Sequence, residues 1–315
     1  MKLLILSHQH VEELLTMREC IRVMEEALAD LARGKVTNPL RMMVRPDGAA
    51  GFLGLMPSYR GDFGLKEICV FPENPKRGLD THLGAVILHD GETGAPKAVI
   101  NASAITAIRT AAVSGAATKL LARRDASTLA ILGAGVQAKS HFEAIPLVRD
   151  IREVRIYSHH PVSSGSFKGC RVVGSAEEAV RDADIVVTAT SSRQPVIRRE
   201  WIKLGAHINA VGSSVKTSRE IDSATMAAAS LFVDRRESTV NESGDYLMAL
   251  AERAITADHI RAELGEVLIG KAPGRTSADE ITLFKSLGLA VEDLASAQFL
   301  FAEAQRRGTG TWVEF

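Results

Sequence analysis

The sequence lacks the features that mark several classes of protein. Its three cysteines, Cys20, Cys69 and Cys170, are widely spaced and form no C-x-x-C pair, which argues against a disulfide framework and a cysteine zinc site. The apolar run from Met1 to Ser7 is too short for a secretory signal, and no segment offers about 18 uninterrupted apolar residues for a membrane helix. We therefore expect a cytoplasmic protein in a reducing compartment.

The sequence also lacks an excess of charge of either sign. Lysine and arginine total 38 residues, as do aspartate and glutamate, so no overall field would attract nucleic acid or an anionic membrane. The motifs G-x-S-x-G, H-E-x-x-H and G-x-x-x-x-G-K-[ST] are absent. We expect a small-molecule partner, no metal, and, at 315 residues with 46% hydrophobic content, a globular protein with room for two domains.

A glycine-rich turn follows a short apolar strand at 128–132 and precedes a helical run over 136–148. Gly133 would make the tight turn, Gly135 would let the backbone approach a pyrophosphate, and Ala138 would let the helix pack closely on the strand. The free N–H groups of the helix would then face the phosphates. The alternative is a purely structural glycine turn. The residues expected to contact a dinucleotide here are Gly133, Ala134, Gly135, Val136, Gln137 and Ala138.

Periodicity divides the chain into two patterns. A helical pattern over 7–31 is followed by short β-like runs at 40–44, 51–56, 64–71 and 84–89, which predict an antiparallel sheet. After a helix over 101–121, strands at 128–132, 153–157, 171–173, 184–190, 207–211 and 231–234 alternate with helical stretches. This alternation predicts an α/β fold with a doubly wound parallel sheet. A capping box is expected at Ser175 to Glu178, and a last helix over 289–305 could return to the first domain.

The end of the second strand of the nucleotide domain bears on the choice of cofactor. An Asp or Glu at this position would bind the ribose hydroxyls of NAD, but the sequence has Ser158, His159 and His160 there. A 2′-phosphate would meet no repulsion, so we favour NADP(H) and leave NAD(H) open. The alternative for the two histidines is a solvated loop. A metal site is disfavoured because adjacent side chains in an extended segment point to opposite faces.

Three cationic residues stand in apolar surroundings. Lys66 shares a strand face with Ile68 and Val70, where burial of the ammonium lowers stability unless it has a charged partner or a functional role. The alternative is a position at the sheet edge from which the amine reaches water. Arg109 is the only charged residue over 98–118, where it could grip a substrate carboxylate or form a buried structural pair. Arg41 alternates with apolar neighbours and could converge on the same anion.

Four blocks occur in a recognisable order: Gly64 to Lys66, Ile105 to Ser114, the Gly133 turn, and Lys285 to Asp293. In this combination the chain resembles the ornithine cyclodeaminase/mu-crystallin family over essentially its full length. The resemblance implies a homodimer whose substrate-binding and dimerisation domain, an α+β domain of residues 1–120 plus 295–315, carries an inserted Rossmann domain of residues 121–294.

The resemblance also implies roles for individual residues. Arg41, Lys66 and Arg109 would surround the amino-acid carboxylate and carry the catalysis, and Thr81 would lie near the substrate. We further expect Gly288 to contact the substrate. On the cofactor side we expect contacts from Thr190, Ser191, Val211 and Ser213.

One departure from the family pattern directs the functional prediction. The cyclodeaminases place a catalytic Asp where this chain has Ser213, so the residue lacks a carboxylate for imine cyclisation and ammonia loss. Ser213, together with 242–245 and 263–267, looks like the ketimine reductase branch. We therefore expect hydride transfer from NAD(P)H to the C=N carbon of an α-imino acid, such as pyrroline- or piperideine-2-carboxylate. Ornithine cyclodeamination, an alanine dehydrogenase-type oxidoreduction, and nucleotide-dependent binding without catalysis are the alternatives.

Overall fold

The computed structural model describes residues 1–162 and 165–315, which form two compact units. One unit comprises Met1–Arg109 with Gly288–Phe315, and the other comprises Thr110–Leu287. The bounds expected from the sequence, after residues 120 and 294, fall later in the chain, at the end of helix α3 (Ala102–Leu121) and inside helix α10 (Ala290–Arg307). Because α3 is one continuous helix, its periodicity gives no sign that the division falls within it.

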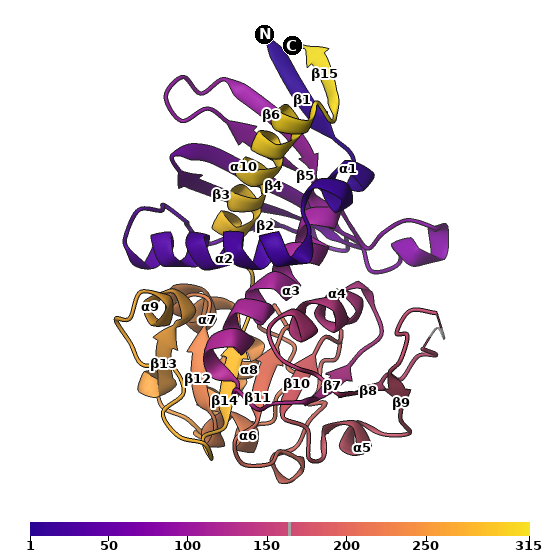
Figure 1. Cartoon of the computed structure of the whole chain (residues 1–315), viewed down its shortest axis with the longest axis vertical. Helices are drawn as coiled ribbons and strands as arrows, with labels where there is room; N and C mark the ends of the chain where they lie inside the picture. The colour runs from indigo at the N-terminus through magenta and orange to yellow at the C-terminus, as the bar shows by residue number, and fades with distance from the viewer. Residues whose placement is uncertain (163–164) are drawn as a thin grey trace. The chain divides into compact units, whose positions relative to one another are not determined.

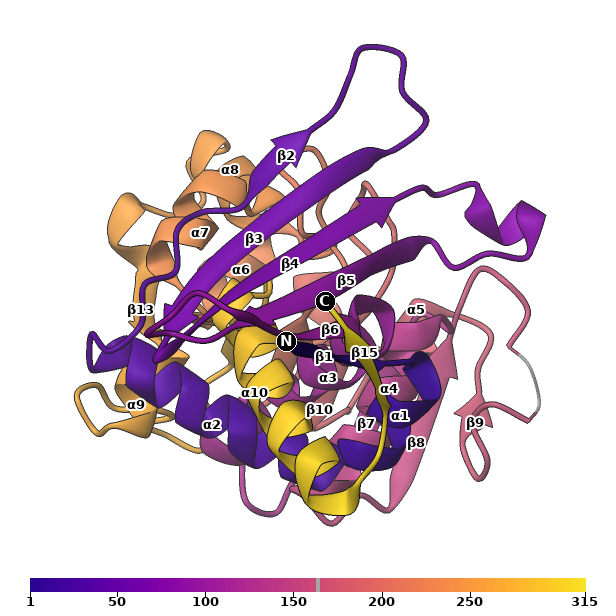
Figure 2. The same cartoon turned by 90° about the horizontal axis from the view of Figure 1, so that it is seen from above.

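The first unit is built on a seven-stranded sheet in the order β15-β1-β6-β5-β4-β3-β2. In chain order its strands are β1 (Lys2–Leu6), β2 (Met42–Val44), β3 (Phe52–Arg60), β4 (Asp62–Val70), β5 (His82–His89), β6 (Pro96–Asn101) and β15 (Thr311–Glu314). Neighbouring strands are antiparallel from β2 through β6, which confirms the antiparallel sheet predicted over 40–89. Strand β1 is parallel to β6 and antiparallel to β15, so the two ends of the chain lie side by side (Figure 1, Figure 2).

Side chains of this sheet alternate between two faces. Met56, Lys66 and Val86 are opposite one another on β3, β4 and β5, and all three are buried. Helix α10 packs on β3 and β4 and also against helix α2 (Met17–Ala32). The inward face of the sheet and these two helices therefore enclose the core of the unit.

The helical pattern over 7–31 forms two helices, not the single helix predicted. Helix α1 (His8–Leu14) ends before Thr16, which caps α2 by accepting a hydrogen bond from the backbone N–H of Glu19, while the Glu19 side chain accepts one from the backbone N–H of Thr16. This capping box starts a new helix within an uninterrupted apolar period. The prediction was wrong here because the spacing of apolar residues does not show where a capping residue ends one helix and starts the next.

The second unit contains an eight-stranded sheet in the order β13-β12-β14-β11-β10-β7-β8-β9 (Figure 1). In chain order its strands are β7 (Thr128–Leu132), β8 (Glu153–Tyr157), β9 (Arg171–Val172), β10 (Ile185–Thr188), β11 (His207–Ala210), β12 (Ser230–Val233), β13 (Ile260–Glu263) and β14 (Thr282–Lys285). All neighbours are parallel, and the winding reverses between β7 and β10. This confirms the doubly wound sheet.

Apolar residues cover both faces of the parallel sheet. Leu129 and Ile131 of β7 belong to one core with Ala138 of helix α4 (Val136–Ala144), and Ala130 belongs to a second core with Met226 of helix α6 (Ser223–Ala228). Strands buried on both faces are typical of parallel sheets. The remaining helices of the unit are α5 (Ala176–Val180), α7 (Arg236–Glu242), α8 (Gly244–Ala251) and α9 (Leu264–Leu268).

The capping box predicted at Ser175 is half formed. The Ser175 hydroxyl accepts a hydrogen bond from the Glu178 N–H at 3.0 Å, but the Glu178 carboxylate accepts its bond from the Gly174 N–H, one residue earlier than the pattern requires. Among the described residues, no helix is long and apolar enough to cross a membrane.

Candidate active site

Lys66 lies in the middle of β4 with its ammonium group inside the first unit. Its Nζ donates a hydrogen bond to the Thr106 hydroxyl at 2.7 Å and lies 3.1 Å from Oδ1 of Asp293, and its side chain is 2% exposed. The alternative that the amine reaches water from a sheet edge was therefore wrong. A lysine buried among apolar strand neighbours requires such a partner.

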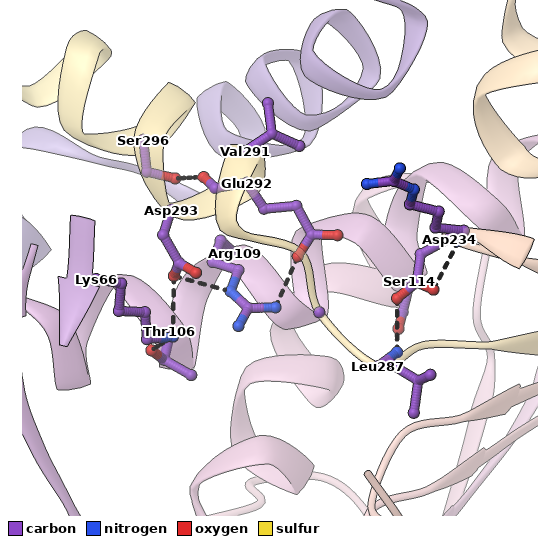
Figure 3. A network of polar contacts seen from close by, with 12 residues as sticks. Lys66, Thr106, Arg109, Ser114, Asp234, Leu287, Val291, Glu292, Asp293 and Ser296 are labelled. Carbon is purple, nitrogen blue, oxygen red and sulfur yellow. Dashed lines mark hydrogen bonds and ion pairs between the residues drawn. The ribbon is translucent and has the colours of Figure 1, made fainter. Parts of the chain in front are cut away.

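Arg109, on α3, binds two adjacent carboxylates from the first turn of α10 (Figure 3). Its Nη1 lies 2.7 Å from Oε2 of Glu292, and its Nε lies 3.2 Å from Oδ1 of Asp293. Acidic residues in the first turn of a helix also interact favourably with its dipole. The structure thus shows the buried ion pair considered as an alternative, while contact between Arg109 and a substrate carboxylate stays a prediction.

The backbone of Gly288 lies between Arg41 and Arg109, the two arginines that are expected to bind the substrate carboxylate. Arg41, just before β2, donates a hydrogen bond from Nη2 to the Gly288 carbonyl at 3.3 Å. Gly288 has φ +78°, and a Cβ at this position would lie 2.4 Å from Nη1 of Arg109. Only glycine fits both the left-handed backbone and this close approach. Arg41, Gly288, Arg109 and Lys66 therefore form one connected cluster through shared contacts.

Burial dominates the electrostatics of this cluster. Loss of solvation lowers the pKa of the Lys66 ammonium to about 8; the carboxylates of Asp293 and Glu292 oppose this change, and Arg109 adds to it. Desolvation also lowers the pKa of His82, with Lys66 and Arg109 acting in the same direction. A lysine with a pKa near neutrality can exchange a proton at physiological pH.

Three further charged or titratable residues of the cluster were missed by the sequence analysis. Glu292 and Asp293 fall inside the block that carries the family resemblance, but their role as partners of Arg109 was not recognised. His82 begins β5, and Thr81, which precedes it, accepts a hydrogen bond from the Phe71 N–H through its carbonyl at 2.9 Å. Contact between Thr81 and the substrate stays a prediction. The available signal was the acidic pair four and five residues after Gly288, in the first turn of a helical pattern.

The glycine turn of the second unit has the features that a dinucleotide requires. Gly133 has φ +116°, and a Cβ there would lie 2.4 Å from the Ala189 carbonyl oxygen. Gly135 caps α4 without a side-chain hydrogen bond and has open space where a Cβ would project, whereas Ala138 is fully buried. The N-terminal N–H groups of α4 thus lie beside a backbone that a pyrophosphate could approach closely.

The other residues expected on the cofactor lie at the carboxyl ends of parallel strands. Ser158 and the exposed His159 and His160 follow β8; the Ser158 hydroxyl accepts a hydrogen bond from the His160 N–H at 3.2 Å. Thr190 and Ser191 follow β10. Val211 and Ser213 follow β11 and are buried, and the Ser213 hydroxyl donates to the Ser218 carbonyl. Residues 163 and 164 lie outside the described residues. Across the described ranges, no group of three His, Cys, Asp or Glu side chains could hold a metal ion.

The sequence pattern of the ornithine cyclodeaminase/mu-crystallin family matches residues 1–308. The chain belongs to this family. It is 38% identical over 326 residues to a Δ1-pyrroline-2-carboxylate reductase of Bacillus cereus, an alignment covering 99% of this chain and 100% of the relative. It is 39% identical over 289 residues to the ketimine reductase mu-crystallin of Mus musculus, covering 88% and 90%.

Solved structures of family members have the same fold. The Δ1-pyrroline-2-carboxylate reductase of Thermococcus litoralis, in complex with NADH and L-proline, superposes with a TM-score of 0.93 at 40% identity, covering 98% of this chain and 99% of that one. An archaeal alanine dehydrogenase dimer with bound NAD has a TM-score of 0.93 at 36% identity and full coverage of both chains. The Rossmann-type assignment of the second unit is therefore confirmed.

Proposed function

We propose that this protein reduces the C=N bond of α-imino acids with NADH or NADPH, and that cyclic ketimine carboxylates such as pyrroline-2-carboxylate or piperideine-2-carboxylate are its substrates. The observation that carries the proposal is the buried Lys66, joined to Arg109 through Asp293. This cluster occurs in a chain that also contains a dinucleotide turn, and its relatives are named as reductases of imino acids.

The cationic cluster is suited to a substrate with a carboxylate. Lys66 and Arg109 pair with the acids Glu292 and Asp293, and Arg41 joins the cluster through Gly288, so these five side chains sum to one positive charge when all are ionised. A substrate carboxylate would bring that sum to zero. Arginine forks at Arg41 and Arg109 would also fix the orientation of the imine, which is how binding lowers a reaction barrier.

Lys66 is suited to supply a proton to the imine nitrogen. A bound reduced nicotinamide would supply hydride to the imine carbon, and the nitrogen must gain one proton to complete the amine. With its pKa lowered to about 8, the Lys66 ammonium is largely protonated at neutral pH yet gives up its proton more readily than an exposed lysine. Asp293 would then hold the proton donor in place.

We infer that NADPH is accepted because no carboxylate follows β8. Ser158, His159 and His160 occupy the segment where an acid would repel a 2′-phosphate. The solved relatives contain NADH and NAD, so NADH is the direct competitor. The ratio of kcat/KM for NADPH and NADH, measured with one imino acid, decides between them.

We also infer a homodimer that acts in the cytoplasm. The outward face of the first sheet is mostly apolar apart from the exposed Glu67, and its residues Phe63 and Leu83 are 49% and 38% exposed. The archaeal relative is described as a dimer. Cys20, Cys69 and Cys170 are free thiols, as expected of a reducing compartment.

The first experiment compares imine reduction with its alternatives. Purified protein is mixed with NADPH or NADH and either Δ1-pyrroline-2-carboxylate, Δ1-piperideine-2-carboxylate, or pyruvate plus ammonia, and nicotinamide absorbance is followed. Rapid loss of absorbance with a cyclic imine is expected. Turnover only with pyruvate and ammonia would instead favour alanine dehydrogenase chemistry, which the 36% identical archaeal relative makes the second candidate.

Two controls complete the test. L-Ornithine with NAD⁺ should yield no proline or ammonia, because Ser213 supplies no carboxylate and its hydroxyl donates to the Ser218 carbonyl. Arg109→Ala should raise KM steeply or abolish turnover. An Arg109→Ala enzyme with normal kinetics would contradict the assignment of the site.

A further inference from the structure

Glu220 is a fully buried glutamate that joins the carboxyl ends of two neighbouring strands in the second unit. Its Oε1 accepts hydrogen bonds from the backbone N–H and the hydroxyl of Thr190, both at 2.7 Å. Its Oε2 accepts from the Gly212 N–H at 2.7 Å and from the Thr188 hydroxyl at 2.8 Å. Thr188 is the last residue of β10 and Thr190 follows it, whereas Gly212 follows β11. One carboxylate therefore receives four donors from two segments.

The backbone around this carboxylate is closely packed. A Cβ at Gly212 would lie 2.1 Å from the Thr190 carbonyl oxygen and 2.5 Å from Oε1 of Glu220. Thr190 and Gly212 are thus held against each other with Glu220 between their N–H groups. Because the strands of this sheet are parallel, both segments lie at the carboxyl edge, where α/β sheets of this kind bind dinucleotides.

The main chain at Glu220 is in turn held by a buried ion pair between Asp245 and Lys285. Oδ1 of Asp245, in the first turn of α8, accepts hydrogen bonds from the backbone N–H groups of Glu220 at 2.7 Å and Ile221 at 2.9 Å. Oδ2 of Asp245 lies 2.8 Å from Nζ of Lys285, at the end of β14, and both side chains are 0% exposed. Burial raises the pKa of the Glu220 carboxyl, as does Asp245, while Lys285 and the Thr190 bonds oppose the change. This buried set of charges fixes the position of the Glu220 main chain.

We propose that Glu220 is a positioning residue for the cofactor: its carboxylate holds the loops after β10 and β11, and hence Thr190, Ser191, Val211 and Ser213, in the conformation that binds the dinucleotide. The inference rests on the proposed use of NAD(P)H by this unit. Glu220 does not touch the cofactor itself, because its side chain is enclosed by protein. It acts through the two loops.

A carboxylate is required at this position because both oxygens must accept. The backbone N–H groups of Thr190 and Gly212 are bound to different oxygens, and neither donor can be reoriented independently of its loop. In Glu220→Gln one oxygen becomes an NH₂ group that faces a donor. A buried donor left without an acceptor is costly, and the loop would be expected to move until water reaches it.

The test compares dinucleotide affinity with stability in variants of the full-length protein. Glu220→Gln should raise Kd for NADPH and NADH, measured by nicotinamide fluorescence, on the order of tenfold or more. It should also raise KM for the nucleotide while KM for the imino acid changes less than about twofold. Thr188→Val removes another hydrogen bond to the same carboxylate but leaves the bonds that the Thr188 carbonyl accepts from the Val211 and Gly212 N–H groups, so it should lower the unfolding temperature and leave Kd unchanged.

A second pair of variants tests the inference if Glu220→Gln does not fold. Thr190→Ser keeps a hydroxyl that can donate to Glu220, whereas Thr190→Val does not. The valine variant should bind dinucleotide more weakly than the serine variant, because only the serine variant keeps the hydroxyl bond to Glu220. Equal Kd values for the parent and a folded Glu220→Gln, or for the serine and valine variants, would overturn the positioning role. A parent that binds neither nucleotide would instead refute the proposed function.

Discussion

The charge of Lys66 should set the pH dependence of reduction. Its pKa is lowered to about 8, so the protonated amine is present below that pH and is lost as the pH rises through it. Reductive turnover should decline over the same interval. Asp293 opposes the lowering, so Asp293→Asn should move the decline to lower pH. The measurement is kcat for imine reduction between about pH 6 and 9.5, with saturating substrates.

Glu26→Gln is the control for this experiment. Glu26 is exposed on α2, where it lies 3.6 Å from the exposed guanidinium of Arg22. Its substitution should leave the pH profile in place. A profile for Asp293→Asn that coincides with that of the parent would show that Lys66 is not the titrating proton donor.

A substitution at Arg41 tests substrate binding with less effect on stability than a substitution at Arg109. Removal of Arg109 would leave Glu292 and Asp293 buried without their guanidinium partner, and breaking a buried ion pair costs about 3–5 kcal/mol. Arg41 is only partly buried and donates to a carbonyl. Because Arg41 is less buried than Arg109, Arg41→Ala should raise KM for the imino acid about tenfold or more while lowering the unfolding temperature less than Arg109→Ala does.

Arg45→Ala is the matched control for Arg41→Ala. Arg45 follows β2 and lies over the Phe52 ring, 4.9 Å from its centroid. Steady-state kinetics should give the parent KM for Arg45→Ala. If both variants raise KM equally, the effect belongs to the conformation of the segment and not to carboxylate binding by Arg41.

Lys66 and Arg109 could be selected from sequence because each is a charge in an apolar pattern. Their partners could not. Asp293 is 184 residues from Arg109 in the chain, and it lies in a segment where acids alternate with apolar residues as they do on any amphipathic helix. Glu220 is preceded by an arginine and followed by an aspartate two residues later, so its complete burial has no local signal. Buried pairing between distant segments is a property of the fold.

At the scale of elements, the glycines that flank the two ends of α10 differ in how closely other atoms surround them. Gly288, before the helix, and Gly308, its C-cap, have φ +78° and +68°. A Cβ at Gly288 would meet Arg109 at 2.4 Å, whereas nothing lies within 4 Å of one at Gly308. Gly308→Ala should lower the free energy of unfolding by only about 1–2 kcal/mol, because alanine disfavours the left-handed backbone conformation. Gly288→Ala should lower stability further and also raise KM, because Arg109 must move.

Thermal unfolding and steady-state kinetics of the two glycine variants test this difference. Gly308→Ala should bind the imino acid as the parent does. A Gly288→Ala enzyme with unchanged KM would show that the position of Arg109 against Gly288 is unimportant for binding.

The elements predicted from sequence were those with a complete local signal. Strand β7 and its glycine turn were predicted because apolar residues, glycines and a helical period follow in order. Strands β1, β6, β13, β14 and β15 were not predicted, because none has such a series of local signals and each is defined by its neighbours in the sheet. Strand β14 inserts between β11 and β12 although it follows both in the chain. Such an insertion depends on burial within the finished sheet.

At the scale of the whole molecule, the outward face of the first sheet is the surface that most resembles an interface. Leu65 of β4 is opposite Pro57 of β3 and Ile87 of β5, and Ile87 is opposite Val99 of β6. This row is parallel to one containing Phe63, which is 49% exposed. Apart from the exposed Glu67, this sheet face is apolar over an extent that is unusual on a monomer, and a two-fold axis through it would bury the same patch on both copies.

The homodimer can be tested by placing a charge on this face. Leu65→Glu would put a carboxylate opposite Pro57 and Ile87, and in a two-fold dimer each copy would bring its own, so desolvation and like-charge repulsion act together. Light scattering after size exclusion should give twice the chain mass for the parent and a shift toward one chain for the variant at micromolar concentration. Leu204→Glu, at an exposed leucine of the second unit, should remain dimeric. A monomeric parent, or a Leu65→Glu variant as dimeric as Leu204→Glu, would place the dimer contact elsewhere or exclude it.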